Sequence, residues 1–474
     1  MRPKRHVFPA PPLPVAPSPH TRRRRMPPPA LLAISLLLLI GTGTVLLRLP
    51  IAHTGPALGW LDALFTATSA ACVTGLVVVD TGSRFSFFGQ FVILALIQIG
   101  GLGVMTIGTV VLLALGQRPT AIVRHLLTGL ARHRPTLRAR DILGIVISIT
   151  LLVEFVGALI LFFAFAHAHP APQAAWLAVF HSVSAFCNAG FALWPDSLTR
   201  YAADPVVNLT VMGLIITGGL GFIVLVELQT WLASRMRRTG APQRLSLHSR
   251  IVLTATAVAL GGGTALILLL EMGNVLAHRP WGERLLIAGF HSVSARTAGF
   301  NTVDIAVLSN PTLLVLLVLM FVGAGPGSMA GGIKLTTATV VLTLVGHRVR
   351  GNREVRVFGR AVSDATLQRA VVLAVLVALL IGLTVCTIEM AGAGGPPSIE
   401  KRGELFEVIF ESVSAFGTVG LSMGITAELN AVAKVLIIAL MFVGRLGPLA
   451  LMDFFAHLPP APPVRHATEE LMVG

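Results

Sequence analysis

The stretch His291–Thr302, HSVSARTAGFNT, decides the fold, because three other parts of the chain repeat its pattern. His181–Phe191 reads HSVSAFCNAGF, Glu411–Leu421 reads ESVSAFGTVGL, and Thr66–Leu76 has the looser version TATSAACVTGL. Each copy reaches a glycine, and the intervals between successive glycines are 115, 109 and 121 residues. A repeat of this period predicts four equivalent structural units. The four glycines are Gly75, Gly190, Gly299 and Gly420.

The composition is that of a membrane protein. Of the 474 residues, 54% are hydrophobic and only 12% are charged, which is far from the usage of a soluble domain. Apolar runs long enough to cross a hydrocarbon core of roughly 30 Å recur along the chain. The net charge of +15 raises the alternative of a nucleic-acid partner. We expect none, because the basic residues sit in short segments between apolar runs, as the positive-inside rule requires.

Each glycine stretch lies in the same setting. A span and a half-length helical stretch precede it, and a second span follows. The sequence therefore predicts an all-α membrane protein of four fused span–pore-helix–span repeats. Eight transmembrane helices and four re-entrant pore helices would surround a central pseudo-fourfold pore. The expected segments are Leu31–Leu47, Trp60–Cys72 and Phe87–Leu115; Ile142–Phe165, Ala174–Phe186 and Val206–Leu232; Ile251–Leu270, Glu283–Ala295 and Thr312–Val345; Leu367–Ile388, Glu404–Phe416 and Val432–Met452.

Polar and basic segments separate the repeats. We place the repeats at residues 30–116, 117–233, 234–347 and 348–455, with a C-terminal tail at 456–474. Residues 1–29 are rich in proline and arginine and predict a disordered cytoplasmic tail. A cleaved signal peptide is the competing interpretation, although no clear cleavage site is present.

The distribution of charge predicts the orientation. Arginines crowd the segments Arg118–Arg140, Arg235–Arg250 and Arg348–Arg369, whereas the opposite segments carry fewer cations and mix them with acids. Cations concentrate on the cytoplasmic side of membrane proteins. We therefore expect both termini in the cytoplasm and the glycine loops toward the outside.

Four glycine loops at membrane depth predict an ion site. Non-helical backbone is tolerated there only where it is buried in protein or lines water. Loops placed around one axis can offer carbonyl oxygens that replace the water of a monovalent cation. The C-terminal ends of the preceding half-helices would add a negative field. The predicted ion-binding filter is Val73, Thr74, Gly75, Asn188, Ala189, Gly190, Thr297, Ala298, Gly299, Thr418, Val419 and Gly420.

These motifs resemble those of the potassium transporter superfamily that includes the Trk, Ktr and plant HKT proteins. The resemblance runs over roughly Leu31–Met452 and rests on VTGL from Val73, NAGF from Asn188, RTAGFNT from Arg296 and TVGLSMG from Thr418. It implies potassium bound at the filter carbonyls, since Gly75 stands where some plant members with sodium preference have serine. A single span before the first pore helix is most similar to the Ktr membrane subunit.

A second feature is a run of small residues in the third repeat. Gly323–Gly332 reads GAGPGSMAGG, and five glycines with Pro326 cannot continue a regular helix. In the family, the corresponding intramembrane loop is a gate; a simple packing kink is the alternative. Arg445 matches a family arginine beneath the filter, and we expect it to hold this loop through its carbonyls. The predicted gate residues are Gly323, Ala324, Gly325, Pro326, Gly327, Ser328, Gly331, Gly332, Lys334 and Arg445.

Several further polar residues lie at membrane depth outside the predicted filter and gate. Arg296 is a cation beside the filter, and we expect it to turn away and brace the loop through carbonyls or a carboxylate, with Glu411 as a candidate partner. His181 and His291 are expected to form hydrogen bonds behind the filter. Polar side chains in spans are costly and suggest function. No role can be assigned to two further acids, Glu154 and Glu227.

The function expected from the resemblance is potassium uptake across the bacterial plasma (inner) membrane by a multi-pass protein. The alternative is an ungated or sodium-permeable monovalent cation channel of the same fold. A transporter with inverted repeats would show two related halves, and the spans carry no catalytic motif, so we expect no enzyme. We expect no cofactor in this chain, sodium as a possible coupling or activating ion, a homodimer, and a cytosolic nucleotide-binding regulatory ring as partner.

Overall fold

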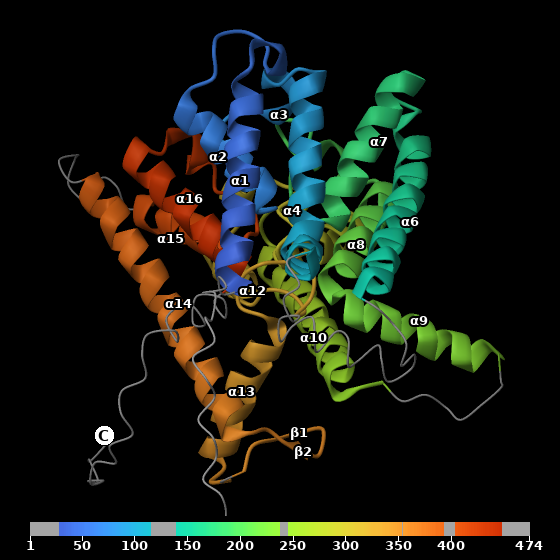
Figure 1. The fold of residues 1–474 in the computed structure, drawn as a ribbon, viewed down its shortest axis with the longest axis vertical. Coiled ribbons are helices and arrows are strands. Elements are labelled where there is room, and N and C mark those ends of the chain that lie inside the picture. The colour runs from blue at the N-terminus through green and yellow to red at the C-terminus, as the bar shows by residue number, and fades with distance from the viewer. Residues whose placement is uncertain (1–27, 115–138, 238–244, 353, 393–402, 448–474) are drawn as a thin grey trace, which may run out of the picture.

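The computed structural model describes residues 28–114, 139–237, 245–352, 354–392 and 403–447, in which helices are joined by loops and the strands form one short hairpin. Figure 1 shows the helices as a bundle, with the β1–β2 hairpin at the same end as α13 and with α3 at the opposite end. The two predicted tails and nearly all of the basic segment Arg118–Arg140 lie outside the described residues. The helices are α1 (Pro28–Arg48), α2 (Trp60–Ala71), α3 (Thr81–Arg84), α4 (Phe87–Ala114), α6 (Ala139–Phe165), α7 (Ala171–Phe186), α8 (Pro205–Leu220), α9 (Phe222–Arg237), α10 (Leu247–Glu271), α11 (Trp281–Ser294), α12 (Asn310–Phe321), α13 (Leu335–Val349), α14 (Asp364–Ala391), α15 (Glu404–Gly417) and α16 (Ala431–Leu446).

The remaining elements are short. The hairpin pairs β1 (Arg356–Val357) with β2 (Arg360–Ala361) in antiparallel register. Single 3₁₀ turns lie in the loops between helices: η1 (Pro50–Ala52), η2 (Thr199–Tyr201), η3 (Ile305–Val307) and η4 (Ile425–Glu428).

The helices pack in four similar groups, each with a first helix, a short helix and a second helix. These groups are α1, α2 and α4; α6, α7 and α8; α10, α11 and α12; and α14, α15 and α16. Each short helix also contacts the second helix of the preceding group: α7 contacts α4, α11 contacts α8, α15 contacts α12, and α2 contacts α16. The last of these contacts joins the end of the described chain to its beginning. The packing is therefore cyclic.

The outer surface of the bundle is apolar. Leu38 of α1, Phe155 of α6 and Leu383 of α14 are exposed by 67%, 66% and 68%. Each of these side chains belongs to a helix long and apolar enough to cross a membrane. Lipid tails solvate such side chains, so the exposed apolar belt is the surface expected for a membrane protein.

Within the described residues, four helices pass that length and composition test, and a bent pair raises the number to five. The four are Ala30–Arg48, Gly144–Phe165, Leu247–Glu271 and Asp364–Ala391. The stretch Phe87–Gly103 of α4, and the helices Asn310–Phe321 and Leu335–Val349, are apolar but shorter than the test requires.

Two expected spans differ from the structure. Val206–Leu232 was predicted as one helix, but it divides at Gly221 into α8 and α9, which are bent by 104°. Gly221 has a φ of +88°, a backbone angle that other residues avoid, and α9 leaves the bundle sideways in Figure 1. In the last predicted span, Val432–Met452, α16 ends at Leu446 and Gly447 has a φ of +81°; residues 448–452 of that span lie outside the described residues.

Candidate functional site

The four repeat glycines lie side by side in a closed ring. A Cβ atom added to Gly75 would approach the Cα of Gly190 to 3.0 Å, and one added to Gly190 would approach the Cα of Gly299 to 3.0 Å. The ring continues from Gly299 to the Cα of Gly420 at 3.1 Å and closes from Gly420 to the Cα of Gly75 at 3.0 Å. Stretches more than 100 residues apart in sequence therefore meet at one point.

The four loops also have the same backbone conformation. In each loop the glycine has a positive φ, and so does the residue two positions earlier: Val73, Asn188, Thr297 and Thr418, at +57°, +58°, +69° and +49°. A positive φ is strained for a non-glycine residue, above all for a β-branched one. Four copies of the same strained turn indicate a conformation that serves a function rather than local sequence preference.

The carbonyl groups of the ring lack hydrogen-bond partners. Among the residues that the structure describes, no donor bonds to a carbonyl oxygen of the twelve predicted filter residues. All of these residues are buried except Gly420, which is half-buried. The Ala189 oxygen lies next to Gly75, and the Thr74 oxygen lies next to Gly420, so the oxygens face the junctions between loops. Buried carbonyls without partners are rare in proteins, and a bound cation satisfies such groups.

The short helices end at the ring. Helices α2, α7, α11 and α15 end one to three residues before the first strained residue of their loop. Their C-terminal carbonyls carry partial negative charge. The field at the ring centre therefore favours a cation.

Four serines behind the ring were not singled out from the sequence. Ser69, Ser184, Ser294 and Ser414 are fully buried near the ends of the short helices. Each accepts, through its own carbonyl, the backbone N–H of the residue before the repeat glycine, at 2.7–2.9 Å. Each hydroxyl also bonds to its loop. Their shared place in the four repeats was the signal that could have identified them.

The histidines behind the ring take structural positions. The Nδ1 atom of His181 lies 2.7 Å from the Leu177 oxygen, and its Nε2 atom accepts the Leu193 N–H at 3.3 Å. His291 repeats the first contact with Ile287 at 3.0 Å. His181 therefore ties its helix to the segment after the filter, as expected.

Arg296 does not pair with Glu411. The Glu411 carboxylate accepts a hydrogen bond from Thr426, whereas Arg296 lines a cavity of about 10 Å³ with Ile216 and Ala324. Its Nε and Nη2 atoms are buried without a hydrogen-bond partner in the described part of the chain. The expected pairing with Glu411 is therefore wrong, and neither of these two nitrogens braces the loop. From the serine of the short helix to the ring glycine, the third loop has one residue fewer than the others, and the Arg296 side chain lies among residues of α8 and α10.

The predicted gate segment forms a loop, residues 322–334, between α12 and α13. Its two ends pair, because the Gly323 N–H donates to the Ile333 oxygen at 2.9 Å and the Leu335 N–H donates to the Ala324 oxygen at 3.0 Å. Close to its second end the segment touches the residue before the fourth ring loop: a Cβ on Gly332 would lie 3.1 Å from the Cα of Gly417. We call this segment the intramembrane loop.

Neighbouring helices hold the intramembrane loop. The Gly325 N–H donates to the Gly219 oxygen of α8 at 3.0 Å, and the Phe222 N–H of α9 donates to the Gly327 oxygen at 3.1 Å. A Cβ on Gly221 would lie 2.7 Å from the Pro326 oxygen. The bend between α8 and α9 therefore makes room for the loop.

Arg445 reaches the intramembrane loop from α16. Its guanidinium is 5% exposed and donates to the carbonyl oxygens of Met329 in the loop and Gly100 in α4, the latter at 2.6 Å. Lys334 is half-buried and donates to the Ala330 oxygen at 2.6 Å. A buried cation thus joins three of the four helix groups beneath the ring.

The two unassigned acids have neighbours. The Glu154 carboxylate accepts a hydrogen bond from Gln98 at 3.1 Å and lies 3.8 Å from the Cys187 sulfur, behind the second loop. Glu227 of α9 accepts hydrogen bonds from Ser246 and Ser249 at the start of α10. These contacts link helices.

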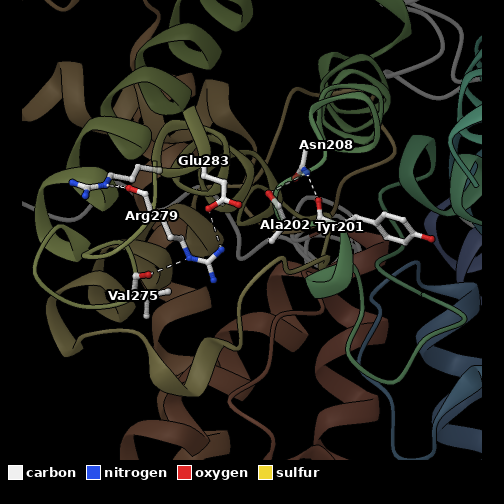
Figure 2. Close-up of polar contacts among 7 residues, drawn as sticks. Tyr201, Ala202, Asn208, Val275, Arg279 and Glu283 are labelled. Atoms are coloured by element: carbon white, nitrogen blue, oxygen red, sulfur yellow. Dashed lines mark hydrogen bonds and ion pairs between the residues drawn. The ribbon is translucent and has the colours of Figure 1, made fainter. Parts of the chain in front are cut away.

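The loops at the α3 end of the bundle are fixed by polar contacts. Figure 2 shows the Asn208 amide donating to the Tyr201 carbonyl, at 2.6 Å, and Arg279 paired with Glu283 at 3.7 Å. Nearby, burial alone would raise the pKa of Asp196, but hydrogen bonds from Thr199 and Arg200 outweigh it and hold that pKa below its usual range. These contacts fix the segments that follow the second and precede the third ring loop.

The cyclic helix packing and the exposed apolar belt define a multi-pass integral membrane protein. The family model described as TrkH, cation transport protein, matches residues 26–465, so the chain belongs to the TrkH family of cation transport proteins, which are transporters and not enzymes.

Relatives of this chain share most of its length. The Ktr system potassium uptake protein B of Bacillus subtilis (strain 168) is 40% identical over 428 residues, covering 89% of this chain and 92% of the relative. The potassium/sodium uptake protein NtpJ of Enterococcus hirae is 34% identical, covering 86% and 88%. The crystal structure of the potassium transporter TrkH from Vibrio parahaemolyticus has the same fold, with a TM-score of 0.70 at 16% identity, covering 92% of this chain and 86% of that one.

Proposed function

We propose that this protein takes up potassium across the plasma membrane through the ring of glycine loops. The observation that carries the proposal is the set of buried carbonyl oxygens that meet in the ring and accept no hydrogen bond in the described residues. A monovalent cation loses its hydration shell only where oxygen dipoles replace it. Potassium is the proposed ion for two reasons. The B. subtilis relative is a potassium uptake protein, and the first loop has a glycine, Gly75, as the other three loops do.

The arrangement in the membrane follows from this proposal. All four helix groups would cross the bilayer, giving eight spans and four re-entrant helices, with the break in the third group beneath the ring. Both termini would be cytoplasmic, since the arginine-rich segments lie on that side of the spans. The ring would then face the outside.

The intramembrane loop is the proposed gate. It touches Gly417 next to the ring, and Arg445 binds its Met329 carbonyl, which supports a plug below the filter. The positive charge of Arg445 would also raise the barrier to a cation that leaves the ring. Deleting several residues of Gly323–Gly332 should raise ion flux in proteoliposomes, and unchanged flux would count against a gate.

The proposed partner is a cytosolic ring of nucleotide-binding subunits that regulates a homodimer of this chain. The word "system" in the name of the B. subtilis relative supports a second component. The basic segment Arg235–Arg250, with Arg118–Arg140, would form part of the docking face. Reversing charges at Arg235 and Arg237 should abolish co-purification with the ring, and retained binding would remove this assignment.

The test of the function is rubidium uptake by cells that lack their own potassium uptake, with and without sodium. Expression of this chain should restore uptake, and potassium should compete better than sodium. Sodium-stimulated uptake would support sodium as a coupling or activating ion. The second candidate is a sodium-permeable channel, which the name of the E. hirae relative favours. Equal competition by sodium and potassium would select it, and no uptake of either ion would overturn both.

A further inference from the structure

The four serines behind the ring form two kinds of hydrogen bond. Ser69 and Ser414 accept the backbone N–H of their own glycine, Gly75 and Gly420, at 3.1 and 3.0 Å. Ser184 instead donates its hydroxyl to the Phe191 carbonyl, at 2.8 Å. Ser294 makes the same contact with Phe300. The serines are equivalent in the repeats, but their hydroxyls hold different atoms.

This difference alters which oxygens the ring can offer. The Phe191 and Phe300 carbonyls follow the glycines of the second and third loops, and a hydroxyl of the short helix behind each loop holds them. The matching carbonyls of the first and fourth loops belong to Leu76 and Leu421, and no donor among the described residues bonds to either. Two carbonyl oxygens of this outer layer therefore accept a hydrogen bond from behind, and the other two are available, because no donor in the described residues bonds to them.

The two available oxygens lie on adjacent loops. In the ring the order is Gly75, Gly190, Gly299 and Gly420, so the first and fourth loops are neighbours. An ion at this layer would have the available carbonyls on one side only. Such a layer cannot close around a small ion as a complete cage would.

We propose that Ser184 and Ser294 are specificity-determining residues, which exclude sodium by holding the Phe191 and Phe300 carbonyls away from the axis. The proposal rests on the proposed function and adds a selectivity role for two side chains that do not touch the ion. Without these hydroxyls, both carbonyls can turn toward the axis and approach an ion smaller than potassium. The serines are positioning residues, and the ion ratio is the property they set.

The test compares two double variants in proteoliposomes, with radioactive rubidium as tracer and potassium or sodium as competitor. The test variant is S184A/S294A. The matched control is S182A/S292A, because Ser182 and Ser292 are equally buried on the same helices but donate to the carbonyls of Glu154 and Leu260, at 2.7 and 2.9 Å, away from the ring. Both variants remove two buried hydroxyls, so a general loss of stability affects them alike.

The potassium-over-sodium ratio should fall about threefold or more in S184A/S294A, the size expected from losing a neutral hydrogen bond, and should stay at the wild-type value in the control. The variant S184T/S294T, which keeps the hydroxyls, should restore it. An unchanged ratio in S184A/S294A, or an equal fall in both double variants, would overturn the proposal.

A second readout needs no transport. Potassium and sodium should each raise the melting temperature of the purified protein, since a bound ion stabilises the folded state. If S184A/S294A is inactive, the single variants S184A and S294A are titrated with potassium and with sodium, and the ion concentration that gives half of the rise in melting temperature replaces the uptake ratio. Wild-type values of both concentrations would overturn the role of the serines. A wild-type protein that prefers neither ion would instead remove the proposed function itself.

Discussion

The ring of glycine loops and the layer beneath it are built from the same four repeats but differ in symmetry. In the ring, all four loops share one backbone conformation and contact each other in order. Beneath it, the third repeat contributes the intramembrane loop, α8 bends at Gly221, and α16 contributes Arg445. Four equal loops can surround one point, whereas the intramembrane loop comes from one repeat and the helices of the others must accommodate it. The fourfold symmetry of the ring therefore does not extend to the layer beneath it.

The largest expected effect comes from breaking the ring. Gly299→Ala would place a Cβ 2.4 Å from the Val419 carbonyl oxygen at a φ of +78°. The backbone angle alone costs about 1–2 kcal/mol, and a displaced carbonyl changes the ion site directly. Rubidium uptake should fall roughly tenfold or more, since 1.4 kcal/mol corresponds to a factor of ten.

Equivalent alanine variants at Gly75, Gly190 and Gly420 measure how equal the loops are. All should reduce uptake by similar factors. The control is Gly213→Ala on α8, where an added Cβ meets no atom within 4 Å. Uptake that survives substitution at any of the four ring positions would contradict a ring of equal loops.

A smaller effect is expected from releasing the layer beneath. Arg445→Gln removes a buried positive charge and its hydrogen bonds to Met329 and Gly100. Hydrogen bonds to charged groups contribute about 1.5–3 kcal/mol, so the intramembrane loop should open more often. Rubidium flux through the purified protein should rise several-fold, whereas Lys334→Gln, which loses a bond within the loop only, should change it less. Flux that stays low in a folded Arg445→Gln variant would argue against a plug held by this side chain.

The bend between α8 and α9 should affect stability more than ion flux. Gly221→Ala places a Cβ 2.7 Å from the Pro326 oxygen at a φ of +88°. Strain of this kind costs about 1–3 kcal/mol, and the melting temperature of the purified protein should fall. An unchanged melting temperature would mean that the loop and the bend adjust to each other freely.

The sequence predicted the ring better than the layer beneath it. Four copies of one motif predicted that the glycines lie together, and the small residues of Gly323–Gly332 predicted a break in the second helix of the third repeat. The bend at Gly221 was missed because glycine is frequent in membrane helices, and only the position of the Pro326 oxygen makes it necessary there. The predicted pairing of Arg296 with Glu411 was wrong for a similar reason. The residues around the Arg296 side chain include Ile216 of the second repeat, and the sequence does not show which repeats pack there.

The serines illustrate the same limit. Ser184 and Ser414 occupy one position in the repeat, yet one donates to a carbonyl and the other accepts from an amide. A sequence repeat predicts that two residues lie at equivalent places. It does not predict which of two nearby atoms each will bind, because that depends on small rotations of the loop.

The smallest predicted effect concerns the contact that closes the cycle of helices. Lys434 of α16 lies 2.9 Å from the Asp62 carboxylate of α2, with side chains 15% and 32% exposed. Partly exposed ion pairs contribute about 0–1 kcal/mol, so Lys434→Met should lower the melting temperature only slightly. A double-mutant cycle with Asp62→Asn isolates the pair, and its coupling should stay below about 1 kcal/mol. A larger coupling would mean that this ion pair, and not apolar packing of α2 on α16, joins the fourth repeat to the first.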